Sequence, residues 1–80
     1  TNKYIYHIIL GNTLLKECKY QESFEAYSEA LTADPFNRKL NAIIYANRAL
    51  ALMKQKQYEL ALKDCDESIR LDEHYFKVRL

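Results

Sequence analysis

The stretch LGNTLLKECKYQESFEAYSEALTADP, from Leu10 to Pro35, contains the only glycine and the only proline of this 80-residue chain. Apolar residues follow helical spacing on both sides of a short polar turn, Glu17 to Lys19. Gly11 lies inside the first helical segment, where glycine costs about 1 kcal/mol relative to alanine. Because Gly11 has no side chain, we expect it where two helices approach closely. Asp34 and Pro35 end the second segment, since proline cannot continue a helix.

The pattern of this stretch returns 38 residues later. When KYQESFEAYSEALTAD (Lys19 to Asp34) is placed over QYELALKDCDESIRLD (Gln57 to Asp72), small residues fall on small ones and large residues on large ones. Gly11 falls on Ala49 at the same offset. A period of about 20 to 50 residues is typical of repeat arrays, and each copy reads as two helices.

The chain is therefore predicted to be all-α, without a strand. We expect one domain fragment over residues 1–80, with repeats at about 4–36 and 37–72 and the start of a third first-helix at about 73–80. The first predicted helix ends near Lys16 and the second begins near Gln21. The third spans about Asn37 to Gln55, and the fourth about Tyr58 to Leu71. The third of these is apolar nearly all round, which predicts packing on both sides. In the fourth, one stripe is predicted to face the core: Tyr58, Leu62, Cys65 and Ile69.

Composition narrows the classes of function. The net charge is +1 and both signs are interspersed, so nothing indicates nucleic-acid binding. No apolar run approaches the roughly 20 residues of a membrane span. Cys18 and Cys65 belong to no Cys/His set, which argues against zinc and favours a reduced cytoplasmic protein. His7 and His74 have no acidic or nucleophilic partner in the sequence, so we expect neither an enzyme nor a cofactor.

The residues at matching places in the two copies resemble the tetratricopeptide repeat, a helix–turn–helix unit of about 34 residues. The resemblance implies a right-handed superhelix in which the first helix of each repeat, helix A, lines a concave groove. The extra residues of the 38-residue offset are expected to extend the second helix A around Arg38 to Asn41. The signature positions matched are Gly11 or Ala49, Ser23 or Ala61, Tyr27, Ala30 and Pro35.

A narrower resemblance concerns carboxylate-clamp co-chaperones. LGN (Leu10 to Asn12) and ADPFNRKLNAIIYANRA are similar to the tetratricopeptide part of J-domain co-chaperones. The likeness implies an adaptor whose groove binds the C-terminal acidic tail of heat-shock chaperones. It assigns peptide binding to Asn12, Asn47 and Lys77, whose amides and ammonium can donate hydrogen bonds to carboxylates. Lys16, one turn beyond Asn12, is an additional candidate.

Two departures leave alternatives open. Ile8 stands where the clamp type has lysine, and the closing arginine would follow Leu80. Asn12 could instead bond only to a neighbouring helix, and the chain could be a scaffold that binds another protein without recognising a carboxylate. Arg48 is expected to pair with an acidic residue inside the repeat. We also expect the apolar end, EHYFKVRL, to permit self-association, since solenoid ends need a polar cap.

Overall fold

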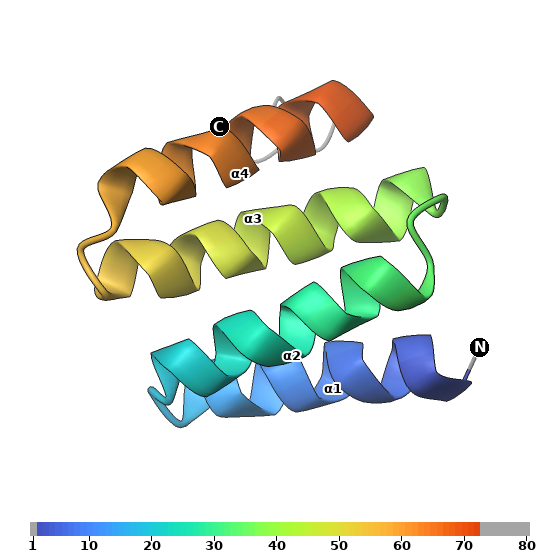
Figure 1. Ribbon diagram of the computed structural model, residues 1–80, viewed down its shortest axis with the longest axis horizontal. Coiled ribbons are helices and arrows are strands. Elements are labelled where there is room, and N and C mark those ends of the chain that lie inside the picture. The colour runs from blue at the N-terminus through green and yellow to red at the C-terminus, as the bar shows by residue number, and fades with distance from the viewer. Residues whose placement is uncertain (1, 73–80) are drawn as a thin grey trace.

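The computed structural model describes residues 2–72, which form four helices: α1 (Asn2–Lys16), α2 (Tyr20–Ala33), α3 (Arg38–Lys54) and α4 (Tyr58–Leu71). Consecutive helices run antiparallel and follow one another across the molecule in chain order (Figure 1). The described residues contain no strand, so the all-α prediction is confirmed. The expected third helix A over 73–80, with Lys77 and the self-association segment, lies outside the described residues.

The two helix–turn–helix pairs share the same turn geometry. α1 packs chiefly on α2, and α3 chiefly on α4. Cys18 and Lys56, 38 residues apart, both have a left-handed backbone, with φ of 62° and 63°. The N–H of Lys19 donates to the carbonyl of Leu14 at 2.9 Å. In the second turn the N–H of Gln57 donates in the same way to the carbonyl of Leu52, also at 2.9 Å. This is the Schellman ending of a helix, a position that glycine usually occupies.

The connection between α2 and α3 is held by polar side chains. The Asn37 side chain caps α3 by accepting a hydrogen bond from the N–H of Leu40 at 3.2 Å. Asn41, in the first turn of α3, donates to the carbonyl of Asp34 at 2.8 Å. The same Asn41 accepts from the hydroxyl of Tyr4 at 2.6 Å. These bonds fix the start of α3 against both α1 and the turn, which positions the rest of α3 beside α1.

Gly11 lies at a helix crossing, as the sequence predicts. A Cβ atom at this position would lie 2.6 Å from two ring carbons of Tyr27 on α2. The hydroxyl of Ser23 donates to the carbonyl of Gly11 at 2.9 Å, a distance between helices that a larger residue would prevent. At the second crossing, Ala49 of α3 and Ala61 of α4 are buried together in one cluster. Small residues at matching places therefore bring both helix pairs close.

The predicted positions of several large apolar residues are wrong. α3 packs on both sides as expected, on α4 and on α2, but it is not buried all round. Four of its large apolar side chains are 37% to 48% exposed: Leu40, Ile43, Leu50 and Met53. The stripe assigned to the core of α4 is also largely exposed, with Tyr58 at 61%, Leu62 at 62% and Ile69 at 41%. Cys65 is half-buried against the second cluster rather than fully buried. The buried face of α4 consists of Ala61, Asp64 and Ser68 instead.

Arg48 forms the ion pair expected inside the repeat. Its Nε and Nη2 atoms donate to the two carboxylate oxygens of Asp64 on α4, at 2.7 and 2.8 Å. Its Nη1 atom donates to the hydroxyl of Ser28 on α2 at 2.9 Å, and the guanidinium lies 5.0 Å from the ring centre of Phe24. All three donor groups have partners within the protein, so Arg48 joins α2, α3 and α4 and is not a candidate ligand-binding residue.

Candidate peptide-binding site

The two candidate asparagines meet at one buried hydroxyl. Tyr27 of α2 is fully buried, and its hydroxyl donates to the Oδ1 atom of Asn12 on α1. The side chain of Asn47 on α3 lies close enough to the same phenol to lower its pKa in part. Asn12 is exposed and Asn47 is half-buried, so both amides stand at the surface above a buried contact. Residues separated by 35 positions in the chain are therefore brought to one point by α2.

The bond from Tyr27 fixes which atoms of Asn12 face solvent. The Oδ1 atom is occupied by the phenol proton, and the NH₂ group has no hydrogen-bond partner within residues 2–72. Burial raises the pKa of the Tyr27 phenol, and hydrogen bonds to Asn47 and Ser23 lower it in part. The phenol therefore stays protonated at neutral pH and remains a donor to Asn12. An amide held in this way offers N–H groups to an incoming acceptor.

Helical spacing places further residues beside the two amides. Positions separated by three or four residues share one face of a helix. On α1 and α3 this rule selects two exposed or half-exposed rows, here called the A-helix face: Ile5, Ile9, Asn12 and Lys16 of α1, and Ile43, Asn47, Leu50 and Lys54 of α3. Each row starts with isoleucine and ends with lysine in the last turn of its helix. The face is therefore apolar at one end, amide in its middle and basic at the other end.

Of the other positions considered for the site, only one lies on the A-helix face within residues 2–72. Lys16 is exposed one turn beyond Asn12, which places it on the A-helix face. Lys77 lies outside the described residues. Ile8 is partly buried and packs on the cluster of Tyr4, Tyr27, Ala30 and Ile44. At this position the chain uses an apolar side chain for packing, where the clamp type has a cation.

Sequence reasoning missed Tyr27, Ile5 and Ile9 as part of this site. Ile5 and Ile9 are 47% and 58% exposed. Their exposure could have been inferred from Asn12 and Lys16, since spacing puts all four side chains on one face of α1. The link from Asn12 to Tyr27 has no such signal, because it depends on how α1 and α2 cross.

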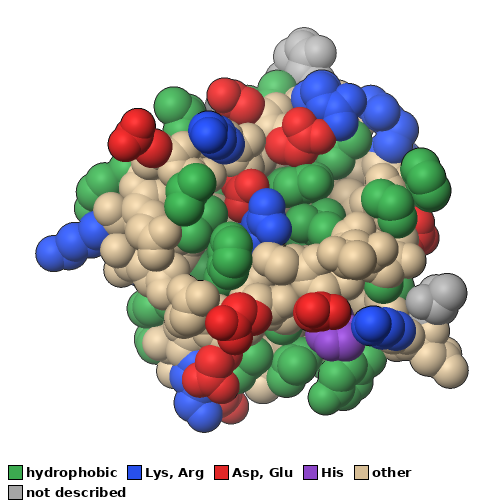
Figure 2. Space-filling model, viewed as in Figure 1, with side chains coloured by type: hydrophobic (Ala, Val, Ile, Leu, Met, Phe, Trp, Pro, Cys, Tyr) green, Lys and Arg blue, Asp and Glu red, His purple; other side chains and the backbone are tan. Residues whose placement is uncertain are grey.

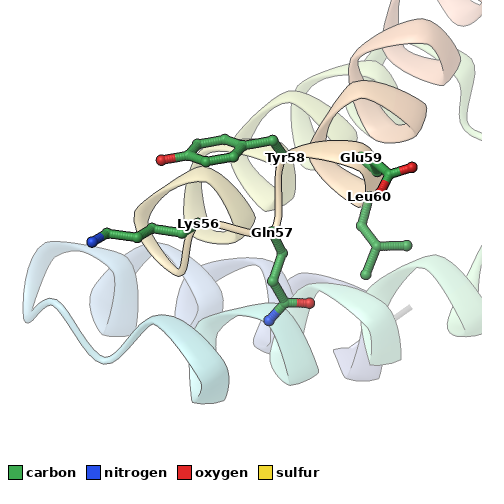
Figure 3. A pocket seen from close by; sticks show the side chains of 5 residues that line it. All are labelled: Lys56, Gln57, Tyr58, Glu59 and Leu60. Atoms are coloured by element: carbon green, nitrogen blue, oxygen red, sulfur yellow. The ribbon is translucent and has the colours of Figure 1, made fainter.

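The rest of the described surface offers weaker candidates. A hollow at the α3–α4 turn is lined by consecutive residues from Lys56 to Leu60, whose side chains point in different directions (Figure 3). Figure 2 shows acidic and basic side chains interspersed with exposed apolar ones. His7 donates from Nδ1 to the carbonyl of Lys3 at 2.8 Å. No group of His, Cys, Asp and Glu suited to a metal ion occurs within residues 2–72. Within the same range, no helix is long and apolar enough to cross a membrane.

Several known proteins are similar to this chain in sequence. Residues 42–75 match the family described as Tetratricopeptide repeat. The chain is 43% identical over 70 residues to the Mus musculus protein DnaJ homolog subfamily C member 7, covering 88% of this chain and 14% of that protein. It is 42% identical over 67 residues to Stress-induced-phosphoprotein 1 of Caenorhabditis elegans, covering 84% and 20%. It is 40% identical over 62 residues to Mitochondrial import receptor subunit TOM34 of Pongo abelii, covering 78% and 19%.

The chain spans between 14% and 20% of the length of these three relatives, so the likeness concerns one part of each. The matched part covers 78% to 88% of this chain. The fold, the family match and the relatives agree with one another. The chain belongs to the tetratricopeptide repeat family.

Proposed function

We propose that this chain is a non-catalytic adaptor module that binds the C-terminal acidic tail of a heat-shock chaperone, in the cytoplasm. The observation that carries the proposal is the meeting of the Asn12 and Asn47 amides at Tyr27, with the Asn12 NH₂ group facing outward. The resemblance to a DnaJ homolog and to a stress-induced phosphoprotein supports the co-chaperone part.

The chemistry suits a terminal carboxylate. A carboxylate accepts several hydrogen bonds, and the two amides supply neutral donors from adjacent helices. Hydrogen bonds to charged groups contribute about 1.5 to 3 kcal/mol each, roughly twice a neutral bond. Lys16 adds a positive charge one turn from Asn12, and Lys77 is the proposed third clamp residue. The isoleucines of the A-helix face can contact aliphatic side chains of the same peptide.

One observation favours the alternative, a scaffold that binds another protein without recognising a carboxylate. Ile8 packs on the core cluster at the place where the clamp type has lysine. The A-helix face consequently has more apolar character than a complete clamp would have. Under this alternative the exposed isoleucines, and not the amides, provide the affinity.

Paired peptides distinguish the two functions. A labelled peptide of eight residues ending in Asp is titrated into the protein with a free C-terminus and with a C-terminal amide. We expect the free acid to bind more tightly, and Asn47→Ala to remove that preference. Gln21→Ala is the matched control, because Gln21 is an exposed amide on α2 that bonds only to Glu25 and Gln55 in the described residues. Equal affinities for the acid and the amide would support the scaffold.

A further inference from the structure

Tyr27 occupies an unusual place for a residue of the core. It comes from α2, yet its hydroxyl reaches side chains of both α1 and α3 at the protein surface. Its ring is confined by Gly11, since even a methyl group there would lie 2.6 Å from the ring. The phenol oxygen is therefore held at a fixed position between the two amides.

This position matters because an exposed asparagine is symmetric in shape but not in chemistry. Rotation of the terminal amide exchanges its oxygen for its NH₂ group at little steric cost. Only the NH₂ group attracts a carboxylate, and the oxygen repels it. A site built from unrestrained amides would spend part of its time in the wrong orientation, and binding would then have to select the correct one.

The hydroxyl of Tyr27 removes this ambiguity. It has one proton, which it donates to the oxygen of Asn12, so this amide cannot turn its oxygen outward without breaking that bond. The phenol oxygen keeps lone pairs that can accept from the NH₂ group of Asn47. The second N–H of that NH₂ group then remains available for a ligand. One hydroxyl thus sets the donor direction of the Asn12 amide, and its free lone pairs favour the same direction at the neighbouring Asn47 amide.

We propose that Tyr27 is the positioning residue of the site, which orients the Asn12 and Asn47 amides so that their N–H groups face a peptide carboxylate. The inference rests on the proposed function and assigns to this buried side chain a role in specificity besides packing. Tyr27 does not touch the peptide. It acts through the amides, so its effect is limited to ligands that have a free C-terminal carboxylate.

Tyr27→Phe tests the inference, with Tyr4→Phe as the matched control. Both tyrosines are buried and both donate to an asparagine oxygen on another helix. Tyr4 bonds to Asn41, which is outside the A-helix face. Phenylalanine keeps the ring in each case, so the variants lose a hydroxyl and retain the packing. Melting temperatures report the structural cost of each change.

We expect Tyr27→Phe to weaken the free-acid peptide about 3- to 10-fold, the loss of roughly one hydrogen bond. The amidated peptide should bind as it does to the unmodified chain. The side-chain NH₂ signals of Asn12 and Asn47 in ¹⁵N NMR spectra should shift in Tyr27→Phe and stay in place in Tyr4→Phe. Tyr4→Phe should leave the ratio of acid to amide affinity unchanged.

Two negative results have different meanings. If the unmodified chain prefers the free acid and Tyr27→Phe keeps that preference in full, Tyr27 is only a packing residue and the inference is overturned. If the unmodified chain binds acid and amide equally, the proposed function itself fails, and a positioning role for Tyr27 fails with it.

Discussion

Leucine in place of Gly11 should destabilise the fold because the contact with Tyr27 leaves no room for a side chain. The ideal Cβ position lies 2.6 Å from Cδ1 and Cε1 of the ring and 2.9 Å from Cζ, and Tyr27 is fully buried. Overpacking of this kind costs about 1 to 3 kcal/mol. Removing a glycine from a helix gains about 1 kcal/mol. The net loss is up to about 2 kcal/mol, which lowers the melting midpoint by up to about 15 °C in a domain of this size.

Thermal unfolding followed by circular dichroism at 222 nm measures this effect. Thr13→Leu is the control, since Thr13 is exposed on the same helix two residues further on. Gly11→Ala should fall between the original chain and Gly11→Leu. The argument from close approach is refuted if Gly11→Leu melts at the same temperature as Thr13→Leu, because α1 and α2 would then be free to separate.

Three further outcomes are expected. Cys18→Gly and Lys56→Gly should each raise the free energy of unfolding by about 0.5 to 1 kcal/mol in urea titrations, since both positions have a left-handed backbone that costs non-glycine residues about 1 to 2 kcal/mol. Burial raises the pKa of Tyr27 above its ordinary value of 10.0, so the stability linked to its proton is present below pH 10 and lost as the pH rises through the raised pKa. Between pH 9 and pH 11, the free energy of unfolding should therefore fall less for Tyr27→Phe than for the unmodified chain. Ile8→Lys should tighten the free-acid peptide and steepen its salt dependence, while lowering the melting midpoint because Ile8 packs on the core.

The repeat, its helix ends and its first helix crossing were predictable from sequence, because they depend on local chemistry. The helix ends near Lys16 and Pro35 follow from turn residues, and the crossing at Gly11 follows from the cost of glycine in a helix. The ion pair of Arg48 was also expected, although the identity of Asp64 as its partner needed the structure. Each of these predictions uses either a short segment or the single 38-residue offset.

The face of α4 was not predictable in the same way. Tyr58, Leu62 and Ile69 form a regular apolar stripe, and hydrophobic periodicity assigns such a stripe to the core. The close approach of α3 and α4 instead selects small residues for the interface, so Ala61 and Ser68 are buried. Periodicity identifies a stripe but does not report how closely the neighbouring helix approaches. Where the interface requires small side chains, the largest apolar residues are displaced to the exposed side.

Under the proposed function, the composition of the A-helix face determines what a bound tail must supply. Two neutral amides donate hydrogen bonds to a carboxylate but add no net charge, and a carboxylate that loses water without a compensating charge is costly to bind. Lys16 provides a positive charge one turn after Asn12. Ile8, one turn before Asn12, provides none. Affinity must therefore come partly from apolar contact with Ile5, Ile9 and Ile43. A tail that combines a free carboxylate with an aliphatic residue should consequently bind better than a purely acidic one, and the same titrations with both kinds of peptide would show it.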